Sequence, residues 1–164
     1  MHGMPHGGDG IPDNDFSGHF CIHFLGSTTH RSGKVDPDHQ LMIYKAGGKI
    51  GDYLNQAAPD QLIDIFFLAL NMREMQIAKM SFAQGKQQQL AFFLQSSPSA
   101  HWIHENQGAA GSKPDATESL AMEIPVDVRM KRTNHKDVHL RMTFELKRSS
   151  ITEPWKIDSI GMVS

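Results

Sequence analysis

The segment MEIPVDVRMKRTNHKDVHLRMTFEL, residues 122–146, carries the clearest pattern in this chain of 164 residues. Apolar and polar residues alternate over 122–130 and again over 138–146, which is the period of a β-strand with one buried face. The polar loop at 133–137 joins the two runs. The segment therefore predicts two half-buried antiparallel strands connected as a hairpin.

The alternation also restricts how the two strands pair. Only a register that pairs even-numbered with even-numbered residues keeps both apolar sets on the same face. Such a register places either Asp127 opposite Arg141 or Glu123 opposite Lys147, and each is a favourable cross-strand pair. The sequence leaves both alternatives open.

Further elements flank this hairpin on both sides. From Pro59 the apolar residues recur with spacings of one, three and four, which predicts a helix, and a Met-rich run at 72–80 either extends it or forms a second helix after a break near Asn71. A short helix is expected at 87–95 and a strand at 101–105. A last strand at 155–162 changes phase near Asp158, as a β-bulge would produce.

Helices followed by long antiparallel strands predict an α+β domain with helices packed on one face of the sheet. This order, together with the closing Trp155-Lys156-Ile157 strand, resembles the cystatin-like cone of the nuclear transport factor two superfamily. Members of that superfamily use the concave sheet as a ligand pocket, as an enzyme site or as an interaction surface. The resemblance implies a small-molecule ligand or a protein partner, and a homodimer formed through the sheet.

The N-terminal part has a different amino-acid composition, since most histidines and glycines of the chain lie before Lys49. We therefore expect a His/Cys-rich leader at 1–48 and the cone domain at 49–164. Within the leader, the alternating run at 18–24 predicts a strand, and Asp36 followed by Pro37 predicts the start of a short helix that runs to Tyr44.

The leader also carries the best candidate for catalysis. His6-Gly7, followed by Gly18-His19-Phe20-Cys21-Ile22-His23, resembles a degenerate form of the L,D-transpeptidase signature, with Cys21 at the position of the nucleophile. The resemblance implies that Cys21 attacks a peptide carbonyl with His19 as base, while His6 or His23 positions the substrate or stabilises charge. Phe20 stands where that family has glycine, and His23 stands where it has arginine.

A longer series is similar to a family of bacterial envelope proteins: Met4-Pro5-His6-Gly7, then Cys21 to Ser27, then Val35 to Gln40. This resemblance implies a location in the cell envelope. A complete transpeptidase-like sandwich needs several strands ahead of the motif, so we expect the leader to be the tail of an incomplete domain.

Two other interpretations of these residues remain open. His19, Cys21 and His23 project from one strand face and could bind a metal, completed by His6, His30, Asp36 or His39. Alternatively, Cys21 is a small buried hydrophobic residue. In the second domain, His101 and His104 on either side of Trp102 either line the cone pocket or occupy an edge strand.

The composition excludes several classes of partner. The formal net charge is −2 and the basic residues are scattered, which argues against nucleic acid or an anionic membrane surface as a partner. No apolar run approaches the ~20 residues of a transmembrane helix, the single cysteine excludes an intrachain disulfide, and no cofactor is predicted. The expected function is a non-catalytic ligand- or partner-binding accessory domain, with an enzyme remnant and a metal-binding leader as alternatives.

Overall fold

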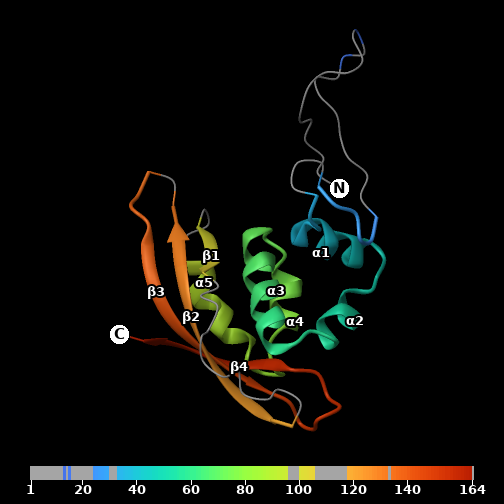
Figure 1. Cartoon of the computed structure of the whole chain (residues 1–164). Helices are drawn as coiled ribbons and strands as arrows, with labels where there is room; N and C mark the ends of the chain where they lie inside the picture. Colours follow the sequence, from blue (N-terminus) through green and yellow to red (C-terminus); the bar gives the residue numbers. More distant parts are fainter. Residues whose placement is uncertain are drawn as a thin grey trace. The chain divides into compact units, whose positions relative to one another are not determined.

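The computed structural model divides the chain into two compact units, Met1–Lys49 and Ile50–Ser164 (Figure 1). It describes residues 13, 15, 24–29, 33–95, 100–105, 118–132 and 134–163. Most of the strand expected at 18–24 lies outside these residues. Its last member, Phe24, is described, and its side chain is exposed.

The first unit contains the helix α1 (Pro37–Ala46). Its start follows from Asp36, whose Oδ1 accepts hydrogen bonds from the backbone N–H groups of Asp38 at 3.0 Å and His39 at 3.3 Å. An aspartate that satisfies the free N–H groups of a first turn is a favourable N-cap. The helix runs to Ala46, slightly beyond the end that the sequence predicts, and Gly47 is its C-cap.

In its described residues, the second unit contains four α-helices and a four-stranded antiparallel sheet. The helical elements are α2 (Ile50–Asn55), α3 (Pro59–Asn71), α4 (Met75–Met80), the 3₁₀ turn η1 (Gln87–Gln89) and α5 (Leu90–Gln95). The strands are β1 (His101–Glu105), β2 (Ala121–Lys131), β3 (Val138–Lys147) and β4 (Lys156–Val163). The predicted α+β class is confirmed, and α2 is an element that the sequence did not indicate.

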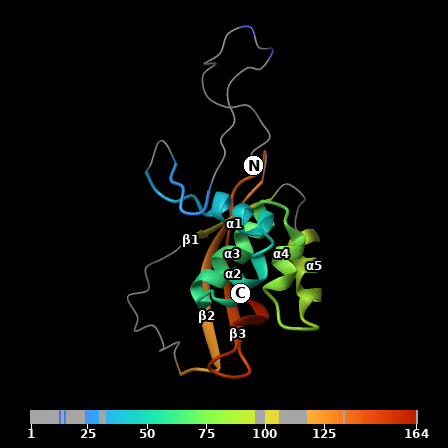
Figure 2. The same ribbon diagram turned by 90° about the vertical axis from the view of Figure 1, so that its right-hand side faces the viewer.

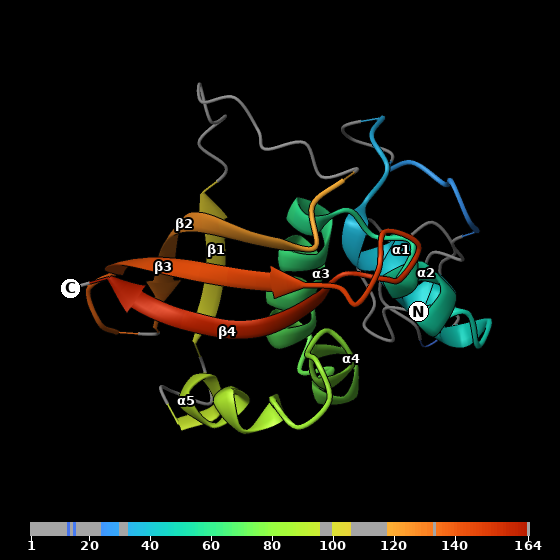
Figure 3. The same ribbon diagram turned by 90° about the horizontal axis from the view of Figure 1, so that it is seen from below.

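The sheet follows the order of the chain, β1-β2-β3-β4, and is not closed. In the view of Figure 3, β2, β3 and β4 lie side by side in this order. Helices α3 and α4 lie on one side of β2 and β3 in Figure 1, and α3 stands in front of these strands in Figure 2. One face of the sheet is therefore covered by helices.

The helix predicted from Pro59 is confirmed, with proline at its first position. Its end resolves the alternative that the sequence left open, because the helix stops at Asn71 and Arg73 adopts a left-handed φ of 59°. A residue in that conformation cannot continue a right-handed helix. The Met-rich run therefore forms a second helix, α4, rather than an extension of α3.

The predicted even-with-even register of β2 and β3 is confirmed. Asp127 lies opposite Arg141, and the Asp127 Oδ1 atom is 3.6 Å from Arg141 Nε. The alternative pair is wrong, since Glu123 lies opposite Glu145 and Lys147 lies opposite Ala121. The shared register therefore places the apolar residues of both strands on the face that the helices cover.

The phase change near Asp158 is also confirmed. Leu146 pairs with Ile157, whereas Glu145 pairs with Ser159, so Asp158 is the extra residue of a β-bulge. Such a bulge lets apolar residues on both sides of it face the same way. Ile157 before the bulge and Ile160 after it consequently both belong to the inner side of the sheet.

The core lies between this inner face and the helices. Phe66 of α3 is fully buried, and its ring lies edge-on to four other phenylalanine rings at centroid distances of 5.2–5.9 Å. These rings belong to Phe67, Phe82, Phe93 and Phe144. The aromatic cluster joins α3, α5 and β3 into one packed layer.

Among the described residues, no helix is both long and apolar enough to cross a membrane.

Candidate functional site

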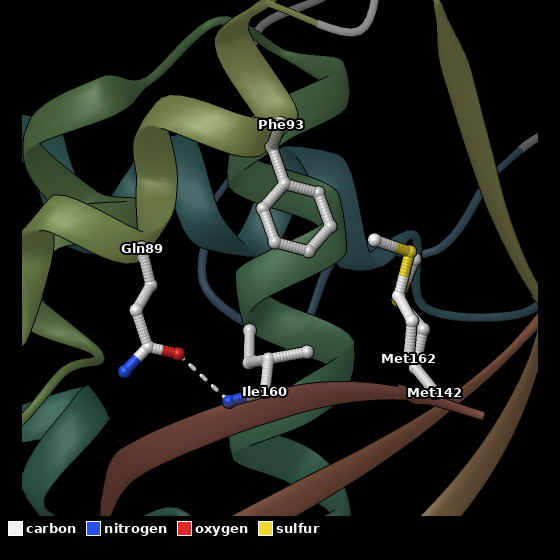
Figure 4. A pocket seen from close by; sticks show the side chains of 5 residues that line it. All are labelled: Gln89, Phe93, Met142, Ile160 and Met162. Atoms are coloured by element: carbon white, nitrogen blue, oxygen red, sulfur yellow. Dashed lines mark hydrogen bonds between the residues drawn. The ribbon is translucent and has the colours of Figure 1, made fainter. Parts of the chain in front are cut away.

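A pocket of about 210 Å³ lies between η1, α5 and the strands β3 and β4 (Figure 4). It is lined by Gln89, Phe93, Met142, Ile160 and Met162. Phe93 and Met142 are buried, while Met162 is 55% exposed. The deep part of the pocket is therefore formed by the core, and Met162 lies where it meets solvent.

The single polar residue of the lining uses its amide for other contacts. Gln89 Oε1 accepts a hydrogen bond from the Ile160 N–H at 2.8 Å, and Gln89 Nε2 donates to the Asp158 carbonyl at 2.9 Å. Figure 4 shows the amide oxygen directed at the backbone of Ile160. Gln89 therefore offers the pocket mainly its aliphatic stem, next to a phenyl ring, two thioethers and an isoleucine.

An ion network connects side chains of β3 and β4 with Lys86, which precedes η1. Lys147 Nζ is 2.8 Å from Glu145 Oε1 and 2.9 Å from Asp158 Oδ2, and Lys86 Nζ is 3.5 Å from Asp158 Oδ1. The Ser159 hydroxyl donates to Glu145 Oε2 at 2.7 Å. Both acids of this network thus have direct hydrogen-bond donors.

These contacts shift the pKa values of the network. Hydrogen bonds from Lys147 and then from Ser159 hold the pKa of Glu145 below its ordinary value. The hydrogen bond from Lys147 likewise lowers the pKa of Asp158, and the one to Glu145 raises the pKa of Lys147. Each shift favours the charged form of the group, which is the expected effect of a close opposite charge.

We expect the second unit to lose stability in acid partly through this network. Glu145 and Asp158 have lower pKa values in the folded chain, so their contribution is present at neutral pH and is lost as the pH falls below about 4. Replacing Lys147 with methionine should reduce the drop in Tm between pH 6 and pH 3, measured by circular dichroism. Lys131→Met, at an exposed position of β2, should keep the wild-type drop in Tm. Equal drops in the wild type and both variants would show that the network does not contribute to the pH dependence of stability.

Trp102, predicted for the ligand site, lies in the core. Its side chain is buried, with its ring 5.2 Å from that of Phe93 and 6.4 Å from that of Phe67. Its backbone N–H donates to Asn71 Oδ1 and its carbonyl accepts from Asn71 Nδ2, both at 2.7 Å. Trp102 therefore anchors β1 against α3 and is not among the five residues of the pocket.

The two histidines beside Trp102 have different surroundings. His104 Nδ1 is 2.6 Å from Asp64 Oδ1, and its ring centroid is 5.9 Å from that of Phe67. His101 is exposed. Neither histidine lines the pocket of Figure 4, so the structure does not gather the three predicted ligand residues there.

The candidate catalytic residues His6, His19, Cys21 and His23 lie outside the described residues, as does His30. Of the other residues considered for a metal, His39 Nδ1 lies 3.6 Å from Asp36 Oδ2 in the first turn of α1. Within the part of the chain that the structure describes, no group of three or more His, Cys, Asp or Glu residues could hold a metal ion.

Comparisons of the chain with protein-family models, with curated proteins and with solved structures find no match. The geometry of the second unit is therefore the observation from which a function can be argued.

Proposed function

We propose that residues 49–164 form a cystatin-like cone that binds a small apolar molecule, as a non-catalytic accessory domain of a bacterial cell-envelope protein. The observation that carries the ligand-binding role is the pocket between α5 and the strands β3 and β4. Apolar concave sites of this kind are where small molecules most often bind. The cone architecture and the envelope location rest on the sequence resemblances alone.

The lining of the pocket favours binding over catalysis. None of its five residues is a nucleophile, and none titrates near neutral pH. The amide of Gln89 already holds Ile160 and Asp158. A ligand would therefore be retained by shape and by the removal of apolar surface from water.

The size of the pocket limits the ligand. A volume of about 210 Å³ is below the roughly 300–1,000 Å³ of sites for drug-sized molecules. A single aromatic ring system or a short alkyl chain fits this space. The two thioethers of Met142 and Met162 suit either shape, because they are flexible and make favourable contacts with aromatic rings.

The test uses indole and octane as probes of the two ligand shapes, with the full chain carrying ¹³C-methyl methionine. We expect the methyl resonances of Met142 and Met162 to shift saturably with at least one probe. Ile160→Phe, which fills the pocket from β4, should weaken binding by about tenfold or more, as expected when a bulky group takes the ligand's place.

Ile151→Phe is the matched control, because Ile151 is 60% exposed and lies outside the pocket. This variant should bind the probes as the wild type does. Resonances that do not shift with either probe, or binding that is equally strong in Ile160→Phe, would contradict the proposed pocket.

The other roles implied by the resemblances stay predictions. They are a protein partner, a homodimer through the sheet, a metal-binding leader, and a remnant of an L,D-transpeptidase-like enzyme that uses Cys21. The residues that would carry catalysis lie outside the described part of the chain.

A further inference from the structure

The two edges of the open sheet are β1 and β4, and a side-chain amide occupies part of each. On β1, both backbone polar groups of Trp102 are bonded to the side chain of Asn71 at 2.7 Å. These groups point away from β2, because they bond to a residue of α3. A neighbouring strand would take up the same two groups.

On the outer edge of β4, a side-chain amide bonds backbone groups of two residues. Gln89 bonds the Ile160 N–H and the Asp158 carbonyl. Just before this point, the Ile157 N–H donates to the Ser81 carbonyl and the Ile157 carbonyl accepts from the Ala83 N–H, both at 2.9 Å. The backbone of Ser81 and Ala83 thus covers this edge at Ile157, and the side chain of Gln89 covers it from Asp158 to Ile160.

A carboxamide suits this position for a chemical reason. Asparagine and glutamine carry an N–H donor and a carbonyl acceptor on one planar group, as a peptide bond does. One such side chain can therefore replace the segment of a neighbouring strand that would pair with two backbone groups. An alanine at the same position would leave both groups to water or to another chain.

We propose that Asn71 and Gln89 are edge-closing residues that prevent an extended strand from adding to the sheet, and that the strand kept out at β4 is β4 of a second copy. Uncovered strand edges are ready templates for pairing with another chain. Two identical edges can pair antiparallel about a two-fold axis, since each offers the other the same groups.

The end of β4 supports this choice of partner. Ladder alternation places the N–H and carbonyl of Met162 on the same outer side as those of Ile160, and the Met162 side chain is 55% exposed. If two copies paired, hydrogen bonds between them could continue along the edge from Ile160, which loss of Gln89 uncovers, to Met162. It would also bring the Met162 side chains of the two copies together on the apolar face of the combined sheet.

The first test is residue-resolved hydrogen exchange on the full chain. In Gln89→Ala, at a concentration low enough for the variant to be monomeric, we expect the Ile160 amide to exchange at least about tenfold faster, because it loses its hydrogen-bond acceptor, while the Trp102 amide keeps its rate. Asn71→Ala should give the reverse pattern. An Ile160 amide that exchanges at the wild-type rate in monomeric Gln89→Ala would overturn the proposal.

The second test is the mass in solution, measured by light scattering over a range of concentrations. Gln89→Ala should reach about twice the wild-type mass, and Gln89→Ala with Met162→Pro should return to the wild-type mass. Proline removes an outward N–H without removing a ladder hydrogen bond to β3. A mass for Gln89→Ala equal to that of wild type, or a doubled mass that persists with Met162→Pro, would exclude pairing through this edge.

Gln89→Glu serves as a further variant if the alanine protein does not fold. It keeps the stem and an acceptor for the Ile160 N–H, but presents a carboxylate oxygen to the Asp158 carbonyl. We expect the Ile160 amide to stay protected in this variant, and its loss of protection would show that Gln89 does not act through that hydrogen bond.

Discussion

Replacing Phe66 with alanine is expected to remove a large part of the stability of the second unit. Phe66 is fully buried at the centre of the aromatic cluster, with rings from α3, α5 and β3 around it. Removing such a ring costs about 3–5 kcal/mol, and a domain of this size is stable by only about 5–15 kcal/mol. The loss should appear as a large fall of the midpoint in urea unfolding.

Two other substitutions serve as references for the loss of stability expected in Phe66→Ala. Phe66→Leu keeps most of the apolar volume and should lie between wild type and Phe66→Ala. Ile151→Ala removes an exposed side chain and should change the free energy of unfolding by less than about 0.5 kcal/mol. If Phe66→Ala were as mild as Ile151→Ala, the packing of α3 on the sheet described above would be wrong.

The strands and their register were predictable because alternation is a property of the chain itself. The sequence could not choose between the two ion pairs, since both are favourable in isolation. The structure selects Asp127 with Arg141 and thereby places Glu123 opposite Glu145. Glu145 of that like-charged pair has compensating partners, because Lys147 of the same strand lies 2.8 Å from its carboxylate and Ser159, opposite it on β4, donates a hydrogen bond to it.

The helical region was less predictable. The six-residue helix α2 buries only Leu54, so it leaves no periodic pattern in the sequence. The helix expected at 87–95 begins instead as the 3₁₀ turn η1 (Gln87–Gln89). There Gln89 meets the edge of β4, and this tertiary contact between residues about 70 positions apart cannot be derived from local propensity.

The pocket was missed for a similar reason. Its residues come from η1, α5, β3 and β4. The alternation in the last two strands does indicate that Met142 and Met162 share the inner face. It does not indicate where the helices leave that face uncovered, because this depends on how α5 packs against the sheet.

For the candidate ligand residues, the sequence predicts which side chains share a face of the strand but not whether that face lines a pocket or the core. Trp102 and His104 are separated by one residue on β1, so both side chains lie on one face and His101 lies on the other. The distinction between pocket and core depends on Phe93 and Phe67, which pack against Trp102 from two helices. Those partners are known only once the helices are placed.

Replacing Val126 with aspartate is expected to have the largest effect on the sheet. Val126 lies on the inner face of β2, opposite Met142, and both side chains are almost completely buried. An unpaired carboxylate at such a position costs several kcal/mol, which is comparable with the whole stability of a domain. At pH 8 the variant should lack the circular dichroism signal of the folded sheet.

Lys131→Asp is the matched control, because it introduces the same residue at an exposed position of the same strand. It should stay folded. Burial raises the pKa of a carboxyl group, so the cost of Val126→Asp should be smaller at pH 5, where protonation neutralises the introduced carboxylate, than at pH 8. Comparable stability of the two variants at both pH values would place Val126 on the solvent side of β2, and the inner face, the pocket and the edge-closing role of Gln89 would then all have to be abandoned.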